Sequence, residues 1–221
     1  MKNKNAFTLA EVLITLGIIG VVAAMTLPIL VNNYQKKVYE TAYAKSVNTI
    51  LNAHKKLLAD AEQFSLCDLE DFECNKQNSL DGISIRDGHL DSYMKKLGFE
   101  KKKVDLGVMR ENFEEAYVSK DGMCYYPYSL FTTTHNSGGP TYEIFVDTNC
   151  AKNPNQGGRD QFFIVMNEQL KLALDVTDDE EEIAEQCFTL VNTKPVSLAS
   201  SAYGGIYCGS YLINNSYKMD Y

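Results

Sequence analysis

A single carboxylate, that of Glu11, lies inside the longest apolar run of this 221-residue sequence. The run extends from Phe7 to Val31 and contains no other charged side chain. A charged side chain at the centre of a membrane helix costs roughly 2.5–3.5 kcal/mol. Among apolar helices, an ionised carboxylate therefore needs a cation or must take up a proton. The sequence thus predicts that Glu11 acts by charge pairing with a partner.

A second group of polar side chains lies between residues 147 and 160, in a segment rich in Asp, Asn and Gly. Carboxylate and amide oxygens on a turn-rich segment suit Ca²⁺, so calcium is the one candidate cofactor. The candidate ligands are Asp147, Asn149, Asn153, Asn155 and Asp160. The spacing is not that of an EF-hand, and such residues are common in turns because they bond to nearby backbone groups. A structural loop without a cofactor is the favoured alternative.

Six cysteines follow the apolar run: Cys67, Cys74, Cys124, Cys150, Cys187 and Cys208. An even number of cysteines in an exported region indicates disulfides, although sequence alone does not fix their connectivity. Pairing of neighbours is predicted: Cys67 with Cys74, Cys124 with Cys150, and Cys187 with Cys208. Zinc binding is the rival interpretation, but the sequence has no Cys-x-x-Cys pair and no histidine at ligand spacing.

Residues that could carry out catalysis are sparse. The three histidines, His54, His89 and His135, are far apart in the sequence. There is no Gly-x-Ser-x-Gly elbow, no P-loop and no His-Glu-x-x-His motif. The sequence therefore predicts that the protein is not an enzyme.

One long helix must position Glu11. Apolar residues continue after the run at spacings of three and four, which predicts a helix from about residue 8 to about 61. Pro28 should bend this helix, because proline removes a backbone donor. The first 25 residues from Phe7 would span about 37 Å as helix, more than the ~30 Å hydrocarbon core of a bilayer. The second half should pack on a sheet.

Residues 62–221 are numerous enough for one globular head with its own core. We expect an α+β fold in which the long helix packs on an antiparallel β-sheet. The segment 62–90 is expected to be irregular. The expected helices are Leu90–Leu97, Glu111–Val118 and Asp178–Cys187, and the expected strands are Gly122–Tyr128, Tyr142–Asp147, Gln161–Asn167, Leu170–Leu174 and Tyr203–Ile213.

The N-terminal pattern resembles a known family. Residues Phe7-Thr8-Leu9-Ala10-Glu11, Ile18-Ile19-Gly20, Ala23-Ala24 and Pro28 are similar to the start of type IV pilins and type II secretion pseudopilins. The resemblance covers about thirty residues. In that family a prepilin peptidase cuts before the phenylalanine and methylates the new amine, which implies cleavage between Ala6 and Phe7. The residue before the cut is usually glycine, and Ala6 is the nearest substitute in size.

The resemblance also implies a role for each segment. Residues 1–6 would be the leader, 7–31 the transmembrane and filament-core helix, 32–61 its amphipathic continuation, and 62–221 a pilin-like head held by disulfides. Glu11 would pair with the Phe7 amine of a neighbouring subunit and set its axial register. Pro28 would also belong to the assembly segment. The implied partners are the peptidase, other subunits, an inner-membrane assembly platform and lipid.

Charge sets the expected orientation. Lys2 and Lys4 precede the apolar run, and positive charge stays cytoplasmic. The N-terminus should thus be cytoplasmic and the head outside. The resemblance implies that the membrane is the inner membrane and that the head is periplasmic before assembly into an extracytoplasmic filament or pseudopilus. The formal charge of −8 argues against non-specific nucleic-acid binding, but does not exclude a specialised DNA-uptake subunit.

Three other interpretations remain open. The apolar run could be a removable secretory signal, because Val22-Ala23-Ala24 is small enough for cleavage. It could be a plain signal anchor. The chain could also be a membrane-tethered binding module or adhesin that does not polymerise. Within the filament interpretation, the sequence does not distinguish secretion, adhesion and DNA uptake.

Overall fold

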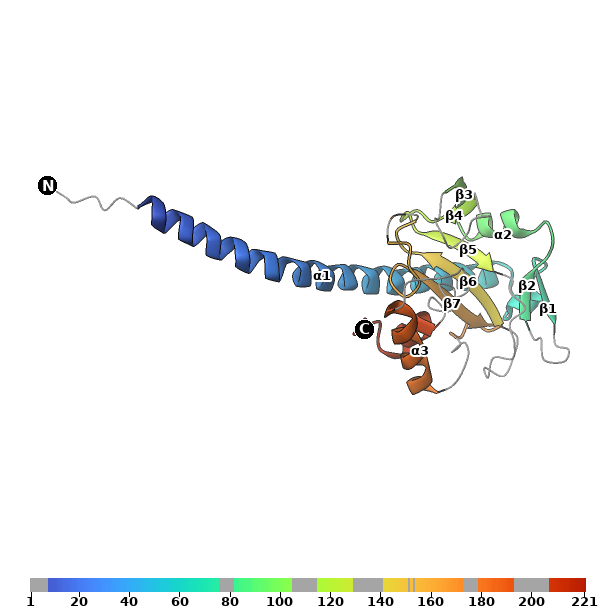
Figure 1. The fold of residues 1–221 in the computed structure, drawn as a ribbon. Coiled ribbons are helices and arrows are strands. Elements are labelled where there is room, and N and C mark those ends of the chain that lie inside the picture. The colour runs from blue at the N-terminus through green and yellow to red at the C-terminus, as the bar shows by residue number, and fades with distance from the viewer. Residues whose placement is uncertain are drawn as a thin grey trace. The chain divides into compact units, whose positions relative to one another are not determined.

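The computed structural model describes residues 8–75, 82–104, 115–128, 141–150, 152, 154–172, 179–192 and 207–221. The chain divides into two compact units, Met1–Val38 and Tyr39–Tyr221. One helix, α1 (Leu9–Asp60), contributes residues to both units (Figure 1). Its bounds agree with the predicted helix, and Pro28 lies inside it. The bend expected near Pro28 stays a prediction.

In the first unit, the described residues are Thr8 and the first part of α1, which is apolar as far as Val31. Large apolar residues such as Leu13, Ile19 and Met25 are at least 60% exposed. This part of the helix is apolar and long enough to cross a membrane, with a mean hydropathy of 2.4 over its most apolar stretch, and none of that stretch is buried. A helix that is apolar all round normally needs an apolar surrounding. It is therefore a candidate membrane anchor.

The second unit contains the rest of α1, and there one face is buried. The buried apolar residues Tyr43, Val47, Ile50 and Leu58 recur near the helical repeat. The Tyr43 ring lies 4.4 Å from that of Phe162 between centroids, and its hydroxyl donates to the carbonyl of Phe163 at 3.0 Å. This confirms the predicted packing of the amphipathic half on a sheet.

The sheet has seven strands in the described part of the chain. They are β1 (Phe72–Asn75), β2 (Gly82–Ile85), β3 (Glu100–Lys103), β4 (Glu115–Val118), β5 (Cys124–Tyr128), β6 (Thr141–Asp147) and β7 (Gln161–Asn167). Their order is β1-β2-β6-β5-β4-β3, and β7 also pairs with β6. All pairs are antiparallel except β2 and β6, which run parallel where Gly82 faces Thr141. The sheet is thus mixed, and the expectation of a purely antiparallel sheet is corrected in this one pair.

Strand β6 is buried at every position. Side chains of a strand alternate between the two faces of a sheet. Ile144 and Val146 belong to the same apolar cluster as Tyr43 of α1, whereas Phe145 belongs to a second cluster with Tyr126 and Phe163. Both faces of the sheet are therefore covered, which explains why the sequence of β6 does not alternate between apolar and polar residues.

The described helices are α1, the short 3₁₀ helix η1 (Leu66–Asp68), α2 (Leu90–Lys96), α3 (Glu180–Asn192) and a helical segment at 207–214. α2 and the three strands β5, β6 and β7 confirm their predictions closely. The turn at Glu168 and Gln169 is also present, and Leu172 bridges Met166 beyond it. The acidic helix begins at Glu180 and extends beyond Cys187.

Three predictions about local structure are wrong. Residues 62–90 are not irregular, because η1, β1 and β2 lie there. Residues 115–118 form strand β4 and not a helix, since Ala116 and Tyr117 bury their side chains in different clusters of the sheet. Residues 207–214 are helical and not a strand. The predicted elements also include residues 111–114, 173–174, 178 and 203–206, which lie outside the described part of the chain.

The segment 207–214 packs against β7 through a glycine. A Cβ atom added to Gly209 would lie 2.5 Å from the carbonyl oxygen of Phe163 and 2.9 Å from the Tyr43 hydroxyl. Only glycine allows this close approach. The contact places the helical segment beside the α1–β7 junction, and a strand at this position would not offer the same surface.

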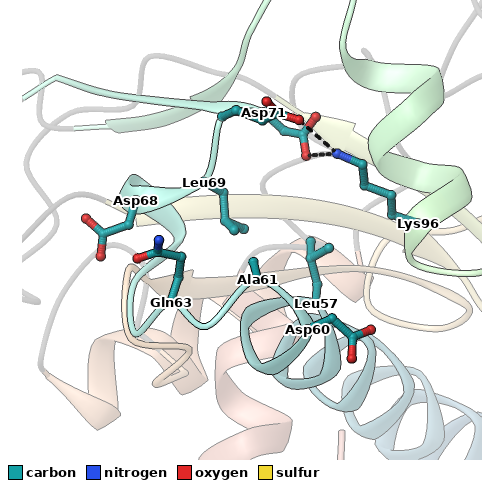
Figure 2. A pocket seen from close by; sticks show the side chains of 9 residues that line it. Leu57, Asp60, Ala61, Gln63, Asp68, Leu69, Asp71 and Lys96 are labelled. Atoms are coloured by element: carbon teal, nitrogen blue, oxygen red, sulfur yellow. Dashed lines mark hydrogen bonds and ion pairs between the residues drawn. The ribbon is translucent and has the colours of Figure 1, made fainter.

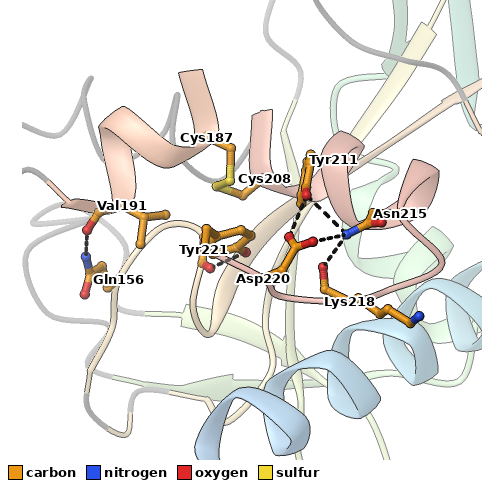
Figure 3. Close-up of a disulfide and its surroundings, with 10 residues drawn as sticks. Gln156, Cys187, Val191, Cys208, Tyr211, Asn215, Lys218, Asp220 and Tyr221 are labelled. Atoms are coloured by element: carbon orange, nitrogen blue, oxygen red, sulfur yellow. Dashed lines mark hydrogen bonds between the residues drawn. A yellow bond between two sulfur atoms is a disulfide. The ribbon is translucent and has the colours of Figure 1, made fainter. Parts of the chain in front are cut away.

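Three disulfides join the predicted partners: Cys67–Cys74, Cys124–Cys150 and Cys187–Cys208. The first joins η1 to β1, and the second joins β5 to the segment after β6. The third joins α3 to the helical segment 207–214, where a strand had been expected (Figure 3). The pairing is as predicted, and no cysteine is free.

Residues 215–221 lie next to α1 and contact it through Met219. The backbone N–H of Met219 donates to Glu40 Oε1 at 2.7 Å, and Glu40 is buried. The Tyr221 hydroxyl donates to the carbonyl of Gly158 at 2.7 Å. Nearby, Asp220 accepts hydrogen bonds from Tyr211 and from Asn215 (Figure 3). Residues 215–221 thus fasten α1 within the head.

Candidate functional site

The start of α1 is closed by a reciprocal pair of side chains. Thr8 Oγ1 accepts from the backbone N–H of Glu11 at 3.2 Å. Glu11 Oε2 accepts in return from the Thr8 backbone N–H at 2.8 Å and from the Thr8 hydroxyl at 2.9 Å. The first N–H groups of a helix have no partner within the helix, and this capping box satisfies two of them, those of Thr8 and Glu11. The Thr-x-x-Glu spacing was visible in the sequence, but its capping role was missed.

The capping box also fixes where the Glu11 carboxylate lies. It holds the carboxylate at the first turn, where a negative charge is favourable for the helix dipole. The Glu11 side chain is exposed in this single chain. The arrangement can therefore offer a positioned anionic oxygen to a cation from outside. Ala6 and Phe7, the predicted cleavage residues, lie outside the described residues.

Farther along the anchor, polar side chains are satisfied within the helix. The Thr15 hydroxyl donates to the carbonyls of Glu11 and Val12, and the Thr26 hydroxyl donates to the carbonyl of Val22. These threonines therefore need no outside partner in an apolar surrounding. A Cβ added to Gly17 or Gly20 would meet nothing within 4 Å. Such small residues leave notches in which another helix can approach closely.

Comparison with protein families identifies this region. The family model described as the prokaryotic N-terminal methylation motif matches residues 1–27. The matched segment contains Phe7, Thr8 and Glu11 together with most of the exposed apolar helix. These features define a chain that carries an N-terminal methylation motif on an apolar helix, which is a candidate membrane anchor. More closely, the chain carries a prepilin motif of the type IV pilin and pseudopilin type. No curated protein and no solved structure matches the chain.

The loop after β6 brings together four of the five candidate calcium ligands. Asp147 Oδ1 accepts from the backbone N–H groups of Asn149 and Cys150 at 3.1 and 2.8 Å, and its Oδ2 accepts from Gln161 Nε2 at 3.0 Å. The fifth candidate, Asn153, lies outside the described residues. Asp147 thus organises the turn that follows β6.

Asp160 closes the same loop from its other end. Its Oδ1 accepts from the Gln156 N–H at 2.7 Å, and its Oδ2 accepts from Asn149 Nδ2 and the Asn155 N–H, both at 2.9 Å. Burial raises the pKa of Asp160 to about 6, and the nearby Asp147 adds to this shift, while the hydrogen bonds oppose it. Every carboxylate oxygen of Asp147 and Asp160 therefore accepts hydrogen bonds from the protein itself.

Metal-binding chemistry has little support here. Among the described residues, no group of three or more His, Cys, Asp or Glu side chains could hold a metal ion. The amide oxygens of Asn149 and Gln161 are buried without a hydrogen-bond partner in the described part of the chain. These oxygens are compatible with a cation, but the hydrogen bonds of both carboxylates are those of a structural loop.

The two described histidines, His54 and His89, do not share a site. His54 is fully buried, and burial lowers its pKa to about 4. Its Nδ1 lies 2.8 Å from the Ile50 carbonyl oxygen and its Nε2 bonds to the Tyr93 hydroxyl, so we assign the hydrogen to Nδ1. His89 pairs instead with Asp71 at 3.1 Å, and His135 lies outside the described residues. His54 is thus a core residue.

Proposed function

We propose that this chain is a pilin-like subunit that prepilin peptidase cleaves between Ala6 and Phe7. The processed subunit assembles into a type IV pilus or a type II secretion pseudopilus, in the service of secretion, adhesion or DNA uptake. The observation that carries the proposal is the match of the methylation motif to residues 1–27. An exposed apolar helix and an α+β head support it.

The proposed assembly step depends on the negative charge of Glu11 at the first turn of α1. Cleavage creates an amine on Phe7, which is the cation that Glu11 needs when apolar helices surround it. An opposite charge is attracted strongly in a medium of low dielectric constant. Glu11 of an incoming subunit therefore pairs with the Phe7 amine of its neighbour, and this pairing selects one axial register. The capping box presents the carboxylate in a fixed position for this step.

Before assembly, the subunit spans the inner membrane once, with a cytoplasmic N-terminus and a periplasmic head. Its partners are the peptidase, an assembly platform, lipid and other subunits. Its work is mechanical and not enzymatic. Nucleic acid is a partner only if the filament serves DNA uptake.

Intact mass and N-terminal sequencing of protein from native membranes test the proposal. We expect a chain that begins at methylated Phe7. A chain that begins at Met1 would reduce the protein to a signal-anchored one. A start near Met25 would show an ordinary secreted protein, and the filament function would then be wrong. A chain cut at Phe7 that stays monomeric under conditions of filament assembly would instead favour a tethered binding module.

We also propose that the head needs no cofactor and that the loop between β6 and β7 is structural. The support is that the protein's own N–H groups occupy the carboxylates of Asp147 and Asp160. Thermal melting of the full chain in detergent, with calcium and with a chelator, tests this. Equal melting temperatures are expected. A rise with calcium that is lost in Asp160→Asn would establish calcium binding instead.

A further inference from the structure

A cavity of about 490 Å³ lies at the C-terminal end of α1 (Figure 2). Its centre is apolar, because Leu57, Ala61 and Leu69 point toward one another there. Polar side chains surround this centre: Asp60, Gln63, Asp68, Glu70, Asp71 and Lys96. A cavity of this size with an apolar base and a few polar groups is typical of a binding site.

The rim of the cavity carries an excess of negative charge. Lys96 is the only cation among the described residues that line the cavity, and it lies 2.8 Å from Asp71 and 3.5 Å from Glu70. Within the described part of the chain, the side chains of Asp60 and Asp68 have no hydrogen-bond or ion-pair partner. The end of α1 adds to this charge, because a helix C-terminus is electronegative and the last turn of α1 has no basic residue.

A disulfide and several hydrogen bonds constrain residues 66–71, which include one wall of the cavity. Residues 68–71 lie within the loop that the Cys67–Cys74 disulfide closes. Arg86 also binds this segment. Its Nε donates to the Glu70 carbonyl at 2.7 Å, and its backbone N–H donates to the Asp71 carbonyl at 2.9 Å. The Leu66 N–H donates to the Glu168 carbonyl at 2.9 Å, which joins η1 to the turn after β7. A preformed site loses less entropy when a partner binds.

An aromatic side chain adjoins this cavity in the sequence. Phe64 follows the lining residue Gln63 and is 90% exposed. It is the one large apolar side chain of the second unit that is strongly exposed within the described residues. Aromatic residues are enriched at protein interfaces, so the exposed Phe64 is a candidate contact residue of a partner that reaches this end of α1.

We propose that this cavity docks a segment of another protein that presents a basic side chain flanked by apolar ones. The negative charges of Asp60 and Asp68 select the basic side chain of the partner, while Leu57 and Leu69 contact the apolar side chains that flank it. A second copy of the chain is the rival occupant, and the sedimentation experiment below decides between the two. In β3, Lys101 and Lys102 are already paired with carboxylates of their own subunit, so they are less free to enter this cavity. The proposal concerns recognition by the head and does not depend on cleavage or filament assembly.

Peptide binding to the full chain in detergent micelles tests this docking site. The probe is a fluorescent hexapeptide in which two arginines alternate with two leucines between terminal glycines. A matched peptide has glutamine in place of arginine. We expect saturable binding of the arginine peptide only, and weaker binding at high salt because salt screens exposed charges.

Variants then locate the site. Asp60→Asn with Asp68→Asn should weaken binding about five- to tenfold, which is the size expected for two exposed charge pairs. The matched control is Glu180→Gln with Glu181→Gln, which removes the same charge from the exposed first turn of α3 and should change affinity less than about twofold. All four residues are exposed, so both variants should fold.

Other results would overturn the proposal. Equal losses in the two variants would show non-specific attraction to an acidic head. No saturable binding of the arginine peptide would rule out this partner chemistry. Sedimentation that shows head-to-head association, lost on Asp60→Asn with Asp68→Asn, would assign the cavity to a second copy.

Discussion

The two parts of α1 have the same secondary structure but opposite surroundings. Up to Val38 the helix exposes apolar side chains, whereas from Tyr39 to Asp60 it buries one face against the sheet. In the second part, even buried polar groups such as Glu40 and His54 have partners in the head. Among the described residues, the first part has no such partners for its apolar surface. The comparison teaches that the head buries the apolar face of its part of α1, whereas the first part leaves its apolar surface exposed.

This difference also shows where specificity can arise. Dispersion and burial between apolar helices have little direction, so they do not select one register. Charge pairing does, and Glu11 is the one charge of the apolar run. If assembly depends on this pairing, a single substitution in the anchor should strongly lower filament yield, while substitutions in the head should lower stability in graded steps.

The largest effect is expected for Glu11→Val and Glu11→Gln. Both remove the charge, but glutamine keeps an oxygen that can accept from Thr8. If charge pairing sets the register, both variants should be cleaved and yield at least about tenfold fewer filaments, since 1.4 kcal/mol of lost pairing suffices. Sheared filament yield and electron microscopy measure this. Normal assembly of Glu11→Gln would show that capping, not charge, is what assembly requires.

Removal of the Cys187–Cys208 disulfide should be the most damaging change in the head. The bridge closes a loop of 21 residues between α3 and the segment 207–214. A crosslink of this length stabilises a fold by about 3 kcal/mol, chiefly through the unfolded chain. Denaturant unfolding of Cys187→Ala with Cys208→Ala, followed by near-ultraviolet circular dichroism of the tyrosines, measures the loss. Cleavage at Phe7 should be unchanged, and impaired cleavage would contradict the independence of anchor and head.

Gly209→Ala should cost less, about 1–3 kcal/mol, which is typical of overpacking. Its new methyl group would press on the Phe163 carbonyl and the Tyr43 hydroxyl. The control is Gly82→Ala, because a Cβ there meets nothing within 4 Å. Denaturant midpoints of the two variants provide the measurement. Equal midpoints would mean that the segment 207–214 packs more loosely than the structure shows.

The smallest effect depends on pH. His54 has a pKa near 4 when folded and about 6.5 when unfolded, so its contribution to stability is full above pH 6.5 and is lost as the pH falls toward 4. The contribution of Asp160 to stability has the opposite pH dependence, because its raised pKa makes the folded state more stable as the pH falls. The free energies of unfolding of His54→Gln and of the unaltered chain, measured at pH 7 and pH 5, separate the contribution of His54 from that of Asp160. The difference between the two chains should shrink at pH 5, and a constant difference would contradict the prediction.

The sequence predicted those parts of the fold whose signal is local. The helical repeat located α1, runs of aromatic and β-branched residues located β5 to β7, and short separations between cysteines indicated the disulfides. Strand β3 was missed because Glu-Lys-Lys-Lys has no apolar residue, and all four residues are exposed. Strand β4 and the segment 207–214 were misassigned because sheet pairing and the Gly209 contact override local propensity.

In the candidate functional site, too, local features could be predicted from the sequence and contacts between distant residues could not. Glu11 was predicted because a charge in an apolar run is visible in sequence, and the structure adds its bonds to Thr8. The candidate calcium ligands lie in one segment, so their proximity could be predicted, but not the hydrogen bonds that occupy their oxygens. The cavity at the end of α1 could not be predicted, because its lining comes from α1, from the loop that Cys67–Cys74 closes, and from α2.

The bond between Met219 and Glu40 has a consequence for the timing of biosynthesis. The two residues are 179 positions apart. At about 5–20 residues per second, a ribosome needs roughly 10–35 s to add Met219 after Glu40 has been made. Throughout this interval the Glu40 carboxylate lacks the Met219 N–H, and the strands of the sheet, the last described of which ends at Asn167, are added only progressively. The buried Glu40 carboxylate therefore lacks this hydrogen bond until Met219 has been made, and folding of the head cannot be completed before then.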